Sequence, residues 1–190
     1  MSDIRKEVTS EIGRGTEKLY YLDAYLREFD ARVLDCREIP ADKTPDASPR
    51  YAIVLDRTAF FPEEGGQSPD KGQLAAARDA GLKEAAAGNA ANVLDVQIKD
   101  GIITHVTDLP FETGTAVHGI LDFAHRFSNM QQHSAEHLFS GLVYSRLGLT
   151  NVGFHLSDTE VTMDYSGPVS EEKAAGLELE VNRIIWQNIE

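Results

Sequence analysis

From Thr16 to about residue 115, the chain consists of short apolar runs of strand length separated by turn-forming residues. In residues 93–106 the apolar alternation is interrupted by Asp100-Gly101, a pair that favours the type I′ turn of a two-residue hairpin. Many short strands joined by tight turns are typical of a small β-barrel. We therefore predict a barrel here, with strands at residues 19–21, 29–33, 51–55, 93–106 and 117–121.

Two stretches of this region differ from the strand pattern. Residues 75–91 are rich in alanine, which predicts a short helix or a variable insertion. Residues 56–72 carry three glycines and two prolines, which predicts a loop with special backbone geometry. Gly65 and Gly66 would let this backbone approach a ligand closely, and Gln67 offers an amide. The alternative, which composition alone favours, is a tight connection between barrel strands without a ligand.

A single helix is predicted for residues 128–148. Ser128 can cap its first turn and Gln131 can bond back to Ser128, which is a capping box. Gly148 stands where a helix ends in a left-handed residue. Side chains three and four positions apart form an apolar stripe, which comprises Met130, Leu138, Phe139, Leu142 and Val143.

After this helix, residues 152–165 alternate between apolar and polar side chains on either side of a turn, which predicts a hairpin. Its polar face would line a pocket or meet water. Ser170 is expected to open a last helix that has no cap before Glu190, which suggests that the domain continues beyond this chain. The polar face of the hairpin comprises His155, Ser157, Thr162 and Asp164.

The composition restricts the partners and the location of the protein. A net charge of −13 argues against general affinity for phosphate backbones, so RNA binding would need a local basic patch. Residues 1–15 form a polar leader without the apolar core of a signal peptide, and no apolar run is long enough to span a membrane. The single cysteine, Cys36, suits a reducing compartment. We therefore expect a cytoplasmic protein.

His133 and His137 are four residues apart in the predicted helix, so their rings lie on one face, one turn apart. Two imidazoles in this arrangement can reach one metal ion. Zinc is the first candidate, because it binds neutral imidazole and needs no redox partner. Two half-exposed surface histidines would show the same spacing.

Four stretches, taken together, resemble the alanyl-tRNA editing proteins, the free-standing relatives of the alanyl-tRNA synthetase editing domain. The resemblance begins at Thr16 and spans nearly all of the remaining chain, with the motifs in the same order and at similar distances. The stretches are residues 16–23, the glycine-rich 58–67, 117–137 with Arg126 and the two histidines, and 152–164.

The resemblance implies an α+β fold, with an N-terminal small β-barrel followed by a two-layer α/β editing domain that is incomplete at its C-terminus. The expected domains are a leader at 1–15, the barrel at 16–115 and the editing domain at 116–190. The implied function is zinc-dependent hydrolysis of seryl or glycyl esters of alanine tRNA, a deacylase activity that this chain alone could lack. Binding of tRNA, and of ATP at the level of the family, is implied, with no membrane or DNA partner. Dimerisation through a later segment is a further expectation.

In the family, zinc has four ligands, of which His133 and His137 match the first pair. The second pair, a Cys-x-x-x-His motif, is not in this sequence and is expected after Glu190. Glu136, Asp164 or His155 could supplement the incomplete shell. The resemblance also implies a catalytic role for the loop residues, and rejection of alanine would need a polar group that bonds the hydroxyl of the serine substrate. The catalytic candidates are Gly65, Gly66 and Gln67, and the substrate-binding candidates are Thr58, His155, Ser157 and Thr162.

Two alternative functions remain open. The chain could be a non-catalytic RNA- or protein-binding module with a degenerate metal site. It could also be an editing domain of threonyl type, which likewise has a His-x-x-x-His helix, although the Gly-Gly-Gln loop favours the alanyl type.

Overall fold

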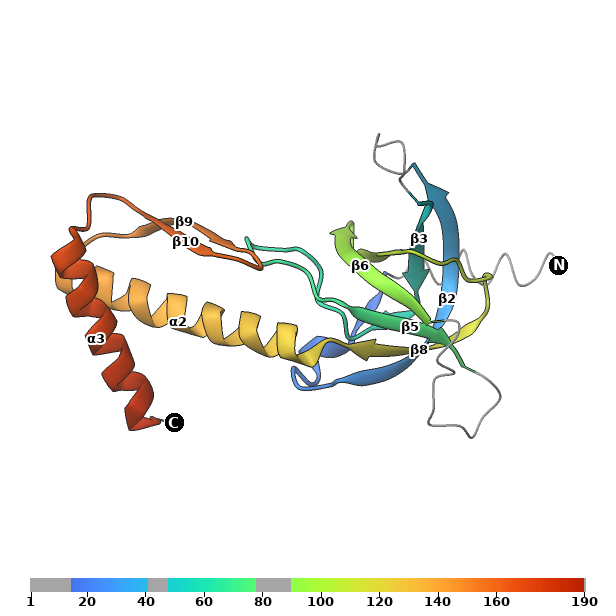
Figure 1. Ribbon diagram of the computed structural model, residues 1–190, viewed down its shortest axis with the longest axis horizontal. Helices are drawn as coiled ribbons and strands as arrows, with labels where there is room; N and C mark the ends of the chain where they lie inside the picture. The colour runs from blue at the N-terminus through green and yellow to red at the C-terminus, as the bar shows by residue number, and fades with distance from the viewer. Residues whose placement is uncertain (1–14, 41–47, 78–89, 190) are drawn as a thin grey trace. The chain divides into compact units, whose positions relative to one another are not determined.

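The structure is a computed structural model, and it describes residues 15–40, 48–77 and 90–189 (Figure 1). The chain forms two compact units, which are considered separately below. The barrel unit contains residues up to 65 together with 69–126, and the helical unit contains 66–68 together with 127–190. Residues 1–14 of the predicted leader and 78–89 of the predicted helix or insertion lie outside the described residues.

The barrel unit contains a closed antiparallel barrel, as predicted. Its strands follow the order β2-β3-β7-β6-β5-β8, and pairing of β2 with β8 closes the sheet. Because β8 follows residue 115, the barrel extends beyond the domain boundary expected there, and the compact units divide at Arg126. The strands are β2 (Glu28–Ile39), β3 (Arg50–Leu55), β5 (Gly72–Ala76), β6 (Ala90–Lys99), β7 (Ile102–Thr107) and β8 (Ala116–Leu121).

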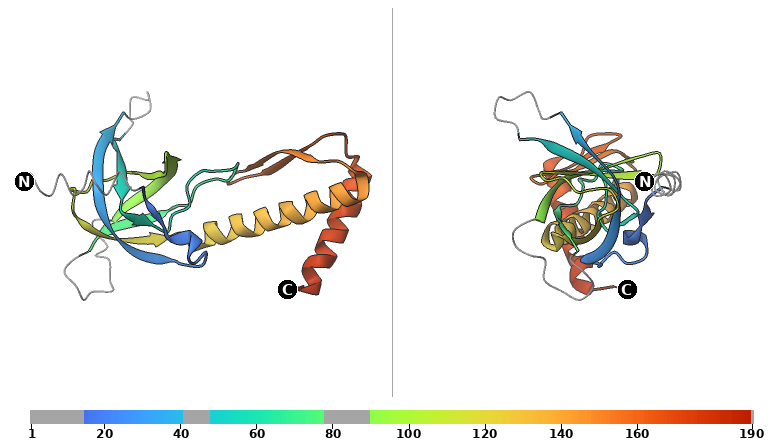
Figure 2. Two further views of the ribbon diagram at one scale, coloured as in Figure 1. Left: turned by 180° about the vertical axis from the view of Figure 1, so that it is seen from behind. Right: turned by 90° about the vertical axis from the view of Figure 1, so that its right-hand side faces the viewer.

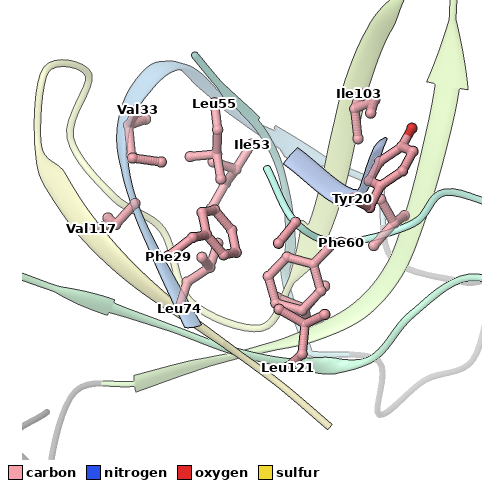
Figure 3. Close-up of a cluster of buried hydrophobic side chains, with 14 residues drawn as sticks. Tyr20, Phe29, Val33, Ile53, Leu55, Phe60, Leu74, Ile103, Val117 and Leu121 are labelled. Atoms are coloured by element: carbon pink, nitrogen blue, oxygen red, sulfur yellow. The ribbon is translucent and has the colours of Figure 1, made fainter. Parts of the chain in front are cut away.

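Alternating side chains of these strands fill the barrel interior (Figure 3). Phe29 and Phe60 lie edge to face, with ring centroids 5.6 Å apart. Burial of such aliphatic and aromatic groups is the main stabilising contribution to a barrel of this size. The aliphatic residues around them are Val33, Ile53, Leu55, Leu74, Val96, Ile103 and Val117.

Local turn chemistry predicted the β6–β7 hairpin correctly but failed elsewhere in the barrel unit. Asp100 and Gly101 have φ values of 52° and 79°, as a type I′ turn requires. The predicted strand at 19–21 is instead a 3₁₀ helix, η1 (Leu19–Tyr21), because Leu22 N–H bonds back to Leu19 O. The prediction of a helix within residues 75–91 is wrong at both ends of that range, because alanines there pair in strands β5 and β6. Closure of the barrel outweighs the helix propensity of these alanines.

A buried histidine lies in the interior of the barrel. The carbonyl of Ile53 can only accept, so His105 Nδ1 donates to it at 3.2 Å. His105 Nε2 then accepts from the hydroxyl of Thr58 at 2.9 Å, and Thr58 Oγ1 accepts from Phe60 N–H. Burial lowers the pKa of His105 from its ordinary 6.5 to about 4, which the bond to Ile53 only partly opposes. The imidazole is therefore neutral at physiological pH.

Burial of the neutral His105 side chain predicts that the barrel is less stable in acid. Between pH 6.5 and 4, an unfolded chain takes up a proton at residue 105 that the folded barrel excludes. The free energy of unfolding should therefore fall as pH falls through this window, by up to about 3 kcal/mol. Urea titrations at several pH values would measure the effect in the native chain, in His105→Gln and in His118→Gln, which alters a half-buried histidine that contacts Asp30 on the outside of the barrel. A pH dependence in His105→Gln as steep as in the native chain would contradict the prediction.

The helical unit contains most of α2 (Phe123–Leu147), the antiparallel hairpin of β9 (Asn151–Leu156) and β10 (Val161–Tyr165), and α3 (Glu171–Gln187). The hairpin runs along α2, as Figures 1 and 2 show. Its apolar face turns toward the helix, where the Phe154 ring stacks on His133 and the Tyr165 hydroxyl meets Ser140. None of the described helices combines the length and apolar character needed to cross a bilayer.

The ends of both helices differ in part from the predictions. The capping box at Ser128 is wrong, because α2 begins at Phe123 and Asp122 accepts from His125 N–H at 3.1 Å. The left-handed end at Gly148 is confirmed, with φ 69°. Ser170 caps the start of α3 as expected. The prediction that this helix has no C-terminal cap is wrong, because α3 ends in a left-handed residue, Asn188.

Candidate metal centre and glycine-rich loop

His133 and His137 converge on α2, as their spacing predicts. Their Nε2 atoms are 3.0 Å apart. Two imidazole ligands of a tetrahedral zinc ion, each about 2.05 Å from the metal, would have nitrogens ~3.3 Å apart. The pair therefore fits the bite of one metal ion, with a small rotation of either ring. A hydrogen bond between the two Nε2 atoms requires that one of them carries a proton and donates it to the other.

The two rings lie in different surroundings. His133 is half-buried, and its ring stacks on Phe154 with the centroids 5.6 Å apart and the planes at 20°. Its burial lowers the pKa of His133, His137 lowers it further, and Glu136 opposes both effects. These effects favour the neutral imidazole, which is the form that binds metal. The His137 side chain, in contrast, is 71% exposed.

Glu136 is the third potential ligand beside the histidines. One carboxylate oxygen of Glu136 and one nitrogen of each histidine all lie within 4.8 Å of one another. The other two residues considered as supplementary ligands are His155 and Asp164. Both lie on the exposed polar face of the hairpin, opposite Phe154. Among the described residues, only Glu136 joins the histidines in a cluster of this kind.

Part of the glycine-rich loop belongs to the same unit and adds to the hairpin. Leu156 N–H donates to Gly66 O at 2.8 Å, and Gln67 forms a parallel bridge with Leu156. A Cβ on Gly66 would lie 2.3 Å from the carbonyl oxygen of Phe154, so only glycine allows this approach. Because Phe154 also stacks on His133, the structure brings Gly66 and Gln67 to the strand that flanks the metal candidates.

A buried ion pair in the barrel unit closes the base of this loop. The carboxylate of Asp70 accepts from Phe61 N–H at 2.6 Å, while Asp70 N–H donates to Phe61 O at 2.9 Å. Arg126 donates from Nε to both oxygens of Asp70 at 2.9 Å and also bonds the carbonyls of Ala24 and Ala59. Residues 61 and 70 are thus held together, with the glycines between them.

The predicted substrate-binding residues lie in two separate places, Thr58 in the barrel and the other three on the β9–β10 hairpin. Thr58 is fully buried in the barrel, where its hydroxyl bonds His105. His155 pairs with Thr162 on the exposed face of the hairpin, away from α2. The Ser157 hydroxyl closes the hairpin turn, where it donates to Glu160 O at 3.0 Å.

Residues that support Glu136 were missed by the sequence analysis. Ser140 and Asn151 both donate to Glu136 Oε1, and Tyr165 contacts Ser140. Ser140 could have been found, because it lies four residues after Glu136 on the same helix face. Asn151 and Tyr165 are brought there only by the folding of the hairpin onto α2, for which the sequence carries no local signal.

Comparisons with known proteins relate this arrangement to a family. The family described as tRNA synthetases class II (A) matches residues 3–125. The alanyl-tRNA editing protein AlaX-L of Pyrococcus horikoshii is 34% identical over 178 residues, covering 91% of this chain and 39% of the relative. AlaX-M of Methanosarcina mazei is 35% identical over 175 residues, covering 91% and 64%. An alanine–tRNA ligase of Pyrococcus furiosus is 32% identical over 179 residues, covering 91% and 17%.

This chain therefore spans only part of each of these relatives, from 39% to 64% of the alanyl-tRNA editing proteins and 17% of the ligase. The similarity to AlaX-L, in turn, covers 91% of this chain and so includes parts of both the barrel unit and the helical unit. The chain belongs to the family of class II (A) tRNA synthetases, and within it is similar to the alanyl-tRNA editing proteins.

Proposed function

We propose that this chain forms part of a zinc-dependent aminoacyl-tRNA deacylase that removes serine or glycine from mischarged alanine tRNA. The observation that carries the proposal is the convergence of His133 and His137 to an Nε2 separation of 3.0 Å. It occurs in a chain similar to proteins named for alanyl-tRNA editing. An ester hydrolase is the reaction class that such a centre suits.

His133 and His137 would hold the metal, with Glu136 as the third group close to them. Bound there, zinc would supply Lewis-acid chemistry, by polarising the ester carbonyl, activating water or orienting the terminal ribose. The resemblance assigns the remaining ligands to a Cys-x-x-x-His motif that this sequence does not contain. Full activity is therefore proposed for the longer protein.

The loop would bind the acyl end of the substrate through its backbone. Gly65 and Gly66 have positive φ values of 63° and 81°, and the space that a Cβ would take on Gly65 is open, with nothing within 4 Å. Backbone N–H groups of Gly65, Gly66 and Gln67 are proposed to hold the ester oxygen as negative charge develops on it. Such donors act without reorganising, since strand β9 holds the loop.

Contacts with the rest of the tRNA are proposed for the outer face of the hairpin. His155, Ser157 and Thr162 lie on that face or at its turn, where they would reach parts of the tRNA other than the ester. Thr58 is left out of this proposal because its hydroxyl is buried and bonded. A cytoplasmic location and dimerisation through a segment absent here belong to the same proposal.

A deacylation assay tests the proposed function. The chain, loaded with zinc, is incubated with alanine tRNA carrying serine, glycine or alanine, and release of the amino acid is compared with the uncatalysed rate. Bound zinc is measured in parallel by elemental analysis. We expect faster release of serine or glycine than of alanine, and His133→Ala should lose both bound zinc and catalysis.

The control for this experiment is His118→Ala, which removes an imidazole from the outside of the barrel and should leave zinc content unchanged. Hydrolysis that persists in zinc-free His133→Ala would contradict the proposed role of the pair. Binding of tRNA without any hydrolysis, in this chain and in a longer form that contains the Cys-x-x-x-His motif, would instead support the non-catalytic binding module.

A further inference from the structure

Glu136 on α2 has a buried carboxylate, which is an unusual position for an acidic side chain. The residue is only 6% exposed, although the next residue on α2, His137, is exposed. Its Oε1 accepts from Asn151 Nδ2 at 2.7 Å and from the hydroxyl of Ser140. Burial of a carboxylate costs free energy unless hydrogen-bond donors compensate it. The two donors, which come from separate elements, therefore indicate that the fold fixes the position of this side chain.

The second oxygen of Glu136 is directed at a metal candidate. Oε2 lies 3.6 Å from His137 Nδ1, slightly beyond hydrogen-bond distance. A carboxylate accepts only, so it favours the tautomer of His137 that carries its proton on Nδ1. In that tautomer the lone pair of His137 is on Nε2, the atom that lies 3.0 Å from His133 Nε2. A modest rotation of the exposed His137 ring closes the remaining gap.

We propose that Glu136 is a positioning residue, which fixes the ring and the tautomer of His137 so that both Nε2 atoms are presented to one metal ion. The inference rests on the proposed metal site, and it assigns Glu136, which the cluster also offers as a potential ligand, to positioning of His137 instead. Asn151 and Ser140 hold the Glu136 carboxylate, and Tyr165 supports Ser140 through a contact of 3.0 Å between their hydroxyls. A carboxylate that accepts from the distal N–H of a metal-binding histidine typically raises metal affinity.

The geometry favours this role over direct catalysis by Glu136. The sequence His133-Ser-Ala-Glu136-His137 has the spacing H-x-x-E-H, in which the glutamate of some zinc peptidases acts as a general base. Here Oε1 is already occupied by two donors, and the group is buried. A general base would need an oxygen free to face water at the metal, whereas Oε2 faces His137 Nδ1.

The test compares Glu136→Gln with the native chain by titration with Co²⁺. The glutamine can still accept from Asn151 and Ser140 through its oxygen, so the fold is retained, but its NH₂ group now points toward Nδ1. We expect Co²⁺ affinity to fall about 10- to 100-fold and the visible absorption bands of bound Co²⁺ to change. The control Glu178→Gln removes an equally charged, exposed carboxylate from α3 and should bind Co²⁺ as the native chain does.

A second readout needs no metal. Nitrogen-15 NMR of the metal-free chain distinguishes the tautomers of His137, which should carry its proton on Nδ1 in the native chain and shift toward Nε2 in Glu136→Gln. Unchanged tautomer populations, or Co²⁺ affinity within twofold of native, would overturn the inference. If neither chain bound Co²⁺, His133 and His137 would not hold the metal in this chain by themselves, while the tautomer measurement would still decide the role of Glu136.

Discussion

Replacing Asp70 with asparagine is expected to lower the free energy of unfolding of the barrel unit by about 3–5 kcal/mol. Arg126 and Asp70 are both nearly inaccessible, with side chains 7% and 3% exposed. The substitution leaves the guanidinium buried without a countercharge, and it weakens the acceptor that holds Phe61 N–H. Loss of one partner from a buried pair costs far more than loss from an exposed pair, because the remaining charge cannot regain water.

Hydrogen exchange of core amides such as those of Val33 and Ile53 would measure this loss in the intact chain, since these amides exchange only when the barrel opens. Arg57→Gln is a suitable control, because Arg57 pairs with Glu17 at 3.4 Å on the exposed surface. It should change the stability by less than about 1 kcal/mol. A loss in Asp70→Asn no larger than in this control would show that the buried pair contributes little.

Gly66→Ala is expected to detach the glycine-rich loop from β9. The new methyl group would meet the Phe154 carbonyl at 2.3 Å, a distance that no rotamer can relieve because both partners are backbone. The left-handed φ of 81° adds a cost of about 1 kcal/mol for any residue with a Cβ. Relief requires movement of the loop, which breaks the bond from Leu156 N–H to Gly66 O.

The neighbouring glycine offers a matched control. Gly65 also has a positive φ, 63°, but a Cβ there would have nothing within 4 Å. Gly65→Ala should therefore cost only the conformational ~1 kcal/mol and leave the amide of Leu156 protected. Amide exchange at Leu156 distinguishes the two variants, with much faster exchange expected in Gly66→Ala alone. Equal protection in both would mean that close approach to Phe154 is not what requires glycine at residue 66.

Much of the secondary structure followed from local patterns. Side chains alternate in a strand, so the β9–β10 hairpin and β3 were visible as alternating or continuous apolar runs. The φ values at Asp100, Gly101 and Gly148 were predictable because few residues tolerate the left-handed region. The start of α2 was missed by five residues, since both Asp122 and Ser128 can cap a helix and only tertiary contacts select between them.

The site was predictable to a similar extent. The convergence of His133 and His137 depends only on helical geometry, which places residues i and i+4 on one face. The loop could be recognised by its glycines, but the strand on which it packs could not. Thr58 illustrates the limit, because its hydroxyl serves a buried histidine 47 residues away, which no local pattern reveals.

The sequence by itself determined the features that arise between residues close along the chain, namely strand alternation, turn types and the histidine pair on α2. Only the tertiary structure decided which strands close the barrel, that Gly66 packs against Phe154, and that Asn151 holds Glu136 beside His137. The same holds for the pair of Asp70 and Arg126, which are 56 residues apart. These contacts depend on burial and close packing between distant segments, whose free energy exists only once the whole chain has folded.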